Sequence, residues 1–200
     1  VRVIAMKLWH CSSARSLRPL WTLEELELEY EVQILPFPPR VFERDYLKVN
    51  SLGTVPFFSD GDIEMTESVG ICQYLIDHYQ RYDFGLEPSH PEYGAYLNWL
   101  HHADATLTFP QTLVLRYTRL EPEERRVPQV VQDYSIWYLS RLKALESALE
   151  NKEFLCADRC TMSDIAVGFA LFLGTTLGLD VRYELYCVRH LAHRIDRDAY

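Results

Sequence analysis

The stretch TVPFFSDGDIEMTESVGICQYLIDHY, residues 54–79, decides the fold class of this chain. Two short apolar segments flank the Asp-Gly pair at residues 60–61, which is the strongest local signal for a β-hairpin. After Thr66 and Glu67 the apolar residues recur at helical spacings. The stretch therefore predicts two antiparallel strands followed by a helix.

The residues before this stretch alternate between strand and helix signals. We expect a strand over residues 3–9, a helix over 16–30, a second strand over 31–35 and a short helix over 41–49. The resulting order βαβαββα fits a thioredoxin-like sheet, in which crossover helices join the first strands and a hairpin joins the last pair.

The second half of the chain carries long helical patterns and no convincing strand. Amphipathic helices are predicted at residues 92–107 and 130–151, with a charged turn between them. A third helix, apolar nearly all round, begins near Thr161 and Asp164, which are spaced as a capping box. We therefore expect a thioredoxin-like domain over residues 1–80, a linker over 81–91 and an all-helical domain over 92–200.

Composition excludes several classes of function. The chain is 48% hydrophobic and 24% charged, as expected of a globular protein, and its net charge of −9 disfavours nucleic acid and anionic membrane surfaces. No apolar run approaches the roughly 18 residues of a membrane span, and no signal-peptide pattern opens the sequence, so we expect a cytoplasmic protein. The five cysteines are scattered without C-x-x-C spacing, which favours reduced thiols and no metal site.

Three pieces of the chain resemble the cytosolic glutathione S-transferase family. They are SSARSLRPLWTLEELELEYEV (12–32), YLKVNSLGTVPFFSDGDIEMTESVGICQYLIDHY (46–79) and FLCADRCTMSDIAV (154–167). The first piece is similar to the serine-type motif of bacterial-type members. The resemblance implies glutathione as co-substrate, attack of its thiolate on a small hydrophobic electrophile, a role in detoxification and a symmetric homodimer.

Two dipeptides are the main candidates for binding glutathione. Val55 and Pro56 begin a strand, and a cis bond between them would turn the Val55 N–H and C=O away from the sheet, toward an extended peptide ligand. Glu67 and Ser68 open a helix, whose free N–H groups and Ser68 hydroxyl suit a carboxylate while Glu67 suits an ammonium. A plain strand-initiating turn and plain helix capping are the simpler interpretations. The resemblance adds Arg40 for the glycyl carboxylate and Asp104 for the γ-glutamyl ammonium across a dimer interface.

The resemblance also points to the residue that stabilises the thiolate. Counted back from the first helix, Ser13 lies where serine-type members have their catalytic residue, and its hydroxyl can donate a hydrogen bond to the thiolate. Ser12 and Cys11 are close alternatives, and Cys11 would imply thiol exchange. Ser12 or Ser13 is also expected to cap the helix.

The remaining candidates line the electrophile pocket that the helical domain is expected to supply, and they are chosen by position: Trp9, His10, Asn98, His101 and Phe109. A glutathione-dependent isomerase, peroxidase or thiol transferase on the same scaffold is an alternative function. A non-catalytic binding module with this fold is another.

Overall fold

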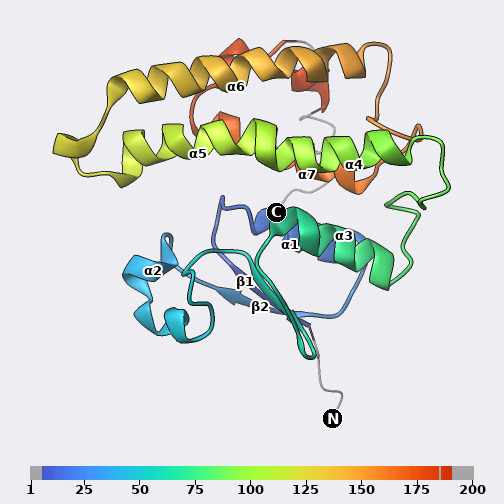
Figure 1. The fold of residues 1–200 in the computed structure, drawn as a ribbon, viewed down its shortest axis with the longest axis horizontal. Coiled ribbons are helices and arrows are strands. Elements are labelled where there is room, and N and C mark those ends of the chain that lie inside the picture. The colour runs from blue at the N-terminus through green and yellow to red at the C-terminus, as the bar shows by residue number, and fades with distance from the viewer. Residues whose placement is uncertain (1–5, 185, 191–200) are drawn as a thin grey trace. The chain divides into compact units, whose positions relative to one another are not determined.

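The computed structural model describes residues 6–184 and 186–190, and the chain divides into two compact units, Val1–Gly85 and Leu86–Tyr200 (Figure 1). The boundary lies within residues 81–91. Each unit is described below by itself.

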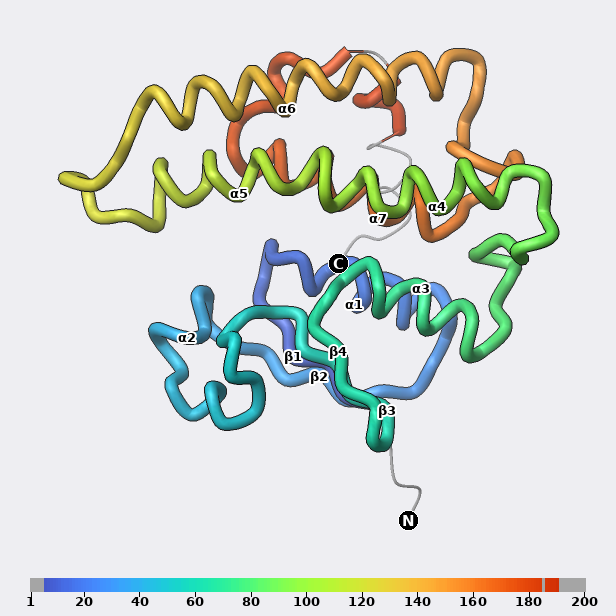
Figure 2. Tube along the Cα trace, in the orientation of Figure 1, coloured from blue at the N-terminus to red at the C-terminus, as the bar shows by residue number. Residues whose placement is uncertain are grey.

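The N-terminal unit has the predicted order βαβαββα. Its elements are β1 (Met6–His10), α1 (Leu17–Glu25), β2 (Glu31–Ile34), α2 (Pro39–Phe42), the 3-10 turn η1 (Arg44–Lys48), β3 (Phe57–Asp60), β4 (Ile63–Met65) and α3 (Ser68–His78). The strands form one sheet in the order β2-β1-β3-β4, in which β1 is parallel to β2 while β3 is antiparallel to β1 and β4. Figure 2 shows the tight β3–β4 hairpin. The thioredoxin-like prediction is confirmed.

The two faces of β1 carry different clusters. Met6, Leu8 and His10 are buried on one face, whereas Lys7 and Trp9 are half-buried on the other. Trp9 packs edge-on against Phe57 of β3, with ring centroids 5.1 Å apart. Both rings join a cluster formed by Cys11, Leu35 and Tyr46, against which Ala14 and Val55 pack.

Helix α1 differs from its prediction in length. It ends at Glu25 rather than Tyr30, and Glu27 adopts a left-handed φ of 52°, which stops the helix. Its buried residues are Arg18, Pro19, Thr22 and Leu23. Two polar side chains therefore lie on the face of α1 that packs inside the unit.

The C-terminal unit is helical, as predicted. Its elements are α4 (Tyr93–His102), the π-helical η2 (Ala103–Thr108), α5 (Phe109–Leu115), the π-helical η3 (Arg116–Leu120), the 3-10 turn η4 (Glu123–Arg125), α6 (Pro128–Leu149), α7 (Met162–Thr176) and the 3-10 turn η5 (Asp180–Arg182). Helices α5 and α6 pack side by side, and α4 packs against α7 (Figure 1).

The helical path through α4 and α5 continues past Leu107, where the prediction ended it. Pro110 lies within this path, although proline lacks an N–H for the helical ladder and clashes with the preceding turn. The π-helical η2 ends at Thr108, two residues before Pro110, and changes the hydrogen-bonding pattern of the helix there. Within this π-helical segment the Thr108 hydroxyl also donates to the Ala103 carbonyl, 2.7 Å away.

Helix α7 is the buried centre of this unit, and its capping box is confirmed. The Asp164 carboxylate accepts hydrogen bonds from the Thr161 N–H (2.8 Å), the Thr161 hydroxyl (2.9 Å) and the Leu155 N–H (3.0 Å).

Among the described residues, no helix has both the length and the hydropathy that a membrane crossing requires.

Candidate functional site

Three loops of the N-terminal unit meet at one edge of the sheet. Trp9 pairs with Phe57 across β1 and β3, so the residues after β1 lie beside the residues before β3. Phe58 pairs with Met65 across β3 and β4, which brings the start of α3 to the same edge. Segments 11–13, 54–56 and 66–68 therefore converge there, although they are far apart in sequence.

The turn after β1 is tied to the strand by Ser16. The Cys11 N–H donates to Ser16 Oγ (3.2 Å), and the same hydroxyl pairs with His10 Nδ1 (2.9 Å). Ser16 is buried and occupies the N-cap position of α1, so the capping role expected for Ser12 or Ser13 is wrong. His10 is also buried, and burial lowers the pKa of its ring, against the opposing effect of the Ser16 bond.

Ser12 and Ser13 present exposed hydroxyls at this turn. Ser13 has a left-handed φ of 56°, which is uncommon for a residue other than glycine. Over residues 6–184 and 186–190, no hydrogen bond within the chain occupies the Ser13 hydroxyl.

Cys11 has a different environment. Its side chain is fully buried, its thiol donates to the Pro36 carbonyl 3.6 Å away, and burial raises its pKa to about 11. Very little thiolate exists at neutral pH under these conditions. The geometry weighs against thiol exchange by Cys11.

The Val55–Pro56 bond is cis, as the sequence suggested. The preceding carbonyl, of Thr54, accepts hydrogen bonds from Tyr46 Oη (2.7 Å) and Asn50 Nδ2 (2.9 Å). Since the Thr54–Val55 peptide is trans, the Val55 N–H points opposite to that carbonyl, away from both donors. No acceptor for this N–H lies in the part of the chain that the structure describes.

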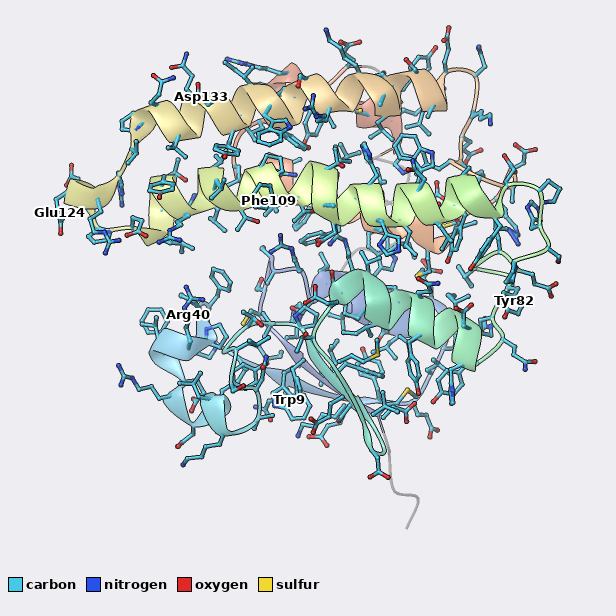
Figure 3. All side chains as sticks on the ribbon, viewed as in Figure 1. Trp9, Arg40, Tyr82, Phe109, Glu124 and Asp133 are labelled. Atoms are coloured by element: carbon cyan, nitrogen blue, oxygen red, sulfur yellow. The ribbon has the colours of Figure 1, made fainter. Side chains whose placement is uncertain are left out.

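Sequence reasoning missed Tyr46 and Asn50. Their signal is a tyrosine and an asparagine four residues apart, just before the Val-Pro pair. Gly53 brings the same loop close to α2: its φ is 60°, and a Cβ there would lie 2.6 Å from Arg40 Cβ. The exposed Arg40, on α2, therefore lies beside the chain that leads to Val55 (Figure 3).

Ser68 is the first residue of α3 and is only 3% exposed. Its Oγ accepts a hydrogen bond from Nη1 of the buried Arg18, 3.1 Å away. The preceding Glu67 is exposed at the N-cap position, and its Oε1 accepts from Thr66 Oγ1 (3.4 Å). Arg18 was also missed, although an arginine and a threonine at positions 18 and 22 of a leucine-rich helix were a signal.

The predicted pocket residues are divided between the two units, with Trp9 and His10 in the N-terminal unit and Asn98, His101 and Phe109 in the C-terminal unit. Trp9 lies against Phe57 with Lys7 Nζ 5.0 Å from its ring centroid. Phe109 is 47% exposed and lies near two rings of α6, with centroids 6.4 Å from Tyr134 and 6.5 Å from Trp137 (Figure 3).

The remaining predicted residues belong to the C-terminal unit. Asn98 and His101 are exposed on α4, and Asp104 is half-buried in η2. Within the described residues, no group of three or more His, Cys, Asp or Glu side chains is arranged to hold a metal ion.

Comparison with known proteins finds similarity to glutathione S-transferases. Residues 4–77 match the model of the glutathione S-transferase N-terminal domain. Glutathione S-transferase 3 of Schizosaccharomyces pombe is 26% identical over 178 residues, covering 82% of this chain and 72% of that protein. Glutathione S-transferase hmp2 of Hypomyces subiculosus is 28% identical over 167 residues, covering 77% and 76%.

The fold also matches solved structures. Ure2p5 from Phanerochaete chrysosporium, cocrystallised with 1-(S-glutathionyl)-2,4-dinitrobenzene, superposes with a TM-score of 0.83 at 20% identity. The match covers 98% of this chain and 91% of that one. It supports the thioredoxin-like sheet and the helical C-terminal region.

Proposed function

Because the matched N-terminal domain and the named relatives support the cytosolic glutathione S-transferase family, we propose that this chain binds glutathione and uses its thiolate to attack a small hydrophobic electrophile. The observation that carries the proposal is the convergence of segments 11–13, 54–56 and 66–68 at one edge of the sheet. Each segment offers a polar group suited to a different part of the tripeptide.

The Val55 N–H, which has no acceptor among the described residues, suits the cysteinyl backbone, which then lies like an added strand. The Ser68 hydroxyl and the N-terminus of α3 suit the γ-glutamyl carboxylate, and Glu67 suits the ammonium on the same carbon. Arg40 is proposed for the glycyl carboxylate because it adjoins the loop before Val55. Asp104 of a second copy is proposed for the ammonium, on the family resemblance.

In the proposed reaction the cysteinyl thiol loses its proton to solvent and the Ser13 hydroxyl donates a hydrogen bond to the resulting thiolate. The sulfur then forms a bond to the electrophilic carbon, and the leaving group departs with its electron pair. The hydroxyl stabilises the anion and so lowers the pKa of the thiol. No carboxylate is needed beside Ser13, because a negative charge would repel the thiolate.

Trp9, His10, Asn98, His101 and Phe109 remain proposed for the electrophile pocket, a homodimer for the assembly and the cytoplasm for the location. A glutathione-dependent isomerase or peroxidase is the second candidate, since it would use the same glutathione residues. Thiol transfer through Cys11 is disfavoured by the burial of its side chain.

Calorimetric titration with glutathione tests binding, and a panel of aryl halides, peroxides and enol-ketone substrates tests the reaction class. We expect binding by the wild type and at least about tenfold weaker binding by Ser68→Ala, since a hydrogen bond to a charged group is worth roughly 1.5–3 kcal/mol. Ser147→Ala, a substitution of an exposed serine on α6, is the matched control. A wild-type protein that binds no glutathione refutes the proposal, and binding without any turnover leaves the non-catalytic module.

A further inference from the structure

A polar seam runs between α1 and α3 inside the N-terminal unit. It consists of Arg18 and Thr22 from α1 and of Ser68 and Cys72 from α3, all buried. Arg18 is fully buried, with 0% of its surface exposed. Burial of a guanidinium is rare and costs free energy, which its hydrogen bonds must offset. The placement of Arg18 therefore calls for a physical role.

The Arg18–Ser68 hydrogen bond restricts what the serine can do. A guanidinium carries five N–H donors and no acceptor, whereas a hydroxyl has one donor and two acceptor sites. Ser68 Oγ must be the acceptor in its 3.1 Å contact with Arg18 Nη1. The Ser68 proton cannot point back to Arg18, so it is directed to another acceptor. Arg18 thus makes Ser68 a donor toward its remaining partner.

The electrostatics of the seam favour a negatively charged partner. Ser68 opens α3, where the helix dipole is positive, and the Arg18 guanidinium adds a full positive charge beside it. The same charge acts one turn further along α3, where Arg18 lowers the pKa of Cys72 against the stronger raising effect of burial. A carboxylate at Ser68 would receive a hydrogen bond from a fixed donor in a positive field.

We propose that Arg18 is a positioning residue that sets the Ser68 hydroxyl as a donor and thereby selects a ligand with a carboxylate on its γ-glutamyl end. The inference rests on the proposed function, because it assumes that glutathione is the ligand at Ser68. It adds a specificity determinant that touches Ser68 and not the ligand. Its signature is a loss of discrimination between ligands with and without that carboxylate.

The test compares glutathione with its analogue γ-aminobutyryl-cysteinyl-glycine, which lacks this carboxylate and is otherwise the same. Both are titrated calorimetrically into the full chain. We expect the wild type to prefer glutathione by about 10- to 100-fold, the equivalent of one charge-assisted hydrogen bond. In Arg18→Met the preference should fall below about threefold, with little change in the affinity for the analogue. Arg18→Lys, which keeps the charge and a donor, should restore part of the preference.

Two further variants complete the design. Arg44→Met removes an exposed arginine of the same unit and should leave the preference unchanged. In the Arg18→Met background, Ser68→Ala should cost no further discrimination, since both side chains act through one hydrogen bond. If circular dichroism shows that Arg18→Met does not fold, Arg18→Gln carries the same expectation, because an amide can either donate to Ser68 or accept from it.

The outcomes separate this inference from the proposed function. A wild type that binds neither ligand refutes the proposed function itself. A wild type that binds both equally, or an Arg18 variant that weakens both ligands by the same factor, overturns the role of Arg18 while leaving glutathione binding in place. Unchanged discrimination in a folded Arg18→Met or Arg18→Gln variant also overturns it.

Discussion

Replacing Tyr46 with phenylalanine removes one hydroxyl from a side chain that is 3% exposed and keeps its ring in the cluster beside Trp9. The lost contact is the 2.7 Å hydrogen bond to the Thr54 carbonyl. Asn50 Nδ2 still donates to that carbonyl from 2.9 Å, so no buried acceptor is left without a partner. We expect the free energy of unfolding to fall by about 1 kcal/mol, the net value of one neutral hydrogen bond.

Removing both donors should cost more than the two single changes together. Tyr46→Phe with Asn50→Ala leaves the Thr54 carbonyl without either partner, and the penalty for an unsatisfied group is roughly 1–3 kcal/mol. A double-mutant cycle should therefore show a coupling between Tyr46 and Asn50 above about 0.5 kcal/mol in the free energy of unfolding. Asn50→Ala also removes the acceptor of the Leu52 N–H (3.1 Å). This cost is the same in the Asn50→Ala variant and in the double variant, so it does not contribute to the coupling.

Urea unfolding followed by tryptophan fluorescence measures these free energies, and calorimetry measures glutathione affinity. The double variant should bind glutathione at least about fivefold more weakly, because the Val55 N–H is no longer held in one direction. Tyr93→Phe, in the other unit, is the control and should stay within about 0.5 kcal/mol of the wild type. Additive stability losses with unaltered glutathione affinity would refute the argument that Tyr46 and Asn50 fix this peptide.

In steady-state kinetics, Ser13→Ala should lower turnover by roughly 10- to 1,000-fold and leave glutathione affinity nearly intact. Ser12→Ala should lower turnover much less. Full activity in Ser13→Ala with loss of activity in Cys11→Ala would overturn the serine assignment. Asp164→Ala removes a buried carboxylate that accepts three hydrogen bonds and should cost about 3–5 kcal/mol in urea unfolding, so a loss below about 1 kcal/mol would contradict its structural role. Burial raises the pKa of Cys72 to about 11 from 9.0, so its contribution to stability is full below pH 9 and is lost as the pH rises to 11. In Cys72→Ala the free energy of unfolding should fall less steeply between pH 9 and pH 11 than in the wild type. Equal slopes in both proteins would argue against this contribution of Cys72. Light scattering at micromolar concentration should give twice the 23.5 kDa chain mass, and a 23.5 kDa particle would count against the homodimer.

The order of strands and helices in the N-terminal unit was predictable because each element carries its own local signal. Asp60-Gly61 specifies the hairpin, and the alternation of strand and helix patterns specifies a crossover. The capping box of Thr161 and Asp164 was predictable for the same reason, since both partners lie within one turn.

The contacts of Arg18 and Cys11 beside the candidate site were not predictable, because they join residues that are distant in sequence or that break the apolar pattern. Arg18 and Ser68 are 50 positions apart, and the local signal of Arg18 and Thr22 on a leucine-rich helix does not identify Ser68 as the partner. Cys11 was ambiguous for a similar reason, since only burial distinguishes an inert thiol from a reactive one.

The π-helical η2 changes the direction in which the side chains after it point from the helix that contains α4 and α5. Each residue of an α-helix turns the chain by about 100°, so a π turn that accommodates one extra residue sets the following side chains back by about that angle. In an uninterrupted α-helix, residues about 11 positions apart lie on nearly the same face, so Asn98 and Phe109 would point in similar directions. The π turn between them changes the direction of Phe109, which lies near the rings of α6. Among homologous chains, we expect a single-residue gap in the alignment of residues 103–108 wherever the helix lacks this turn. Removal of one residue there would keep the helix and give every side chain after it a new set of neighbours.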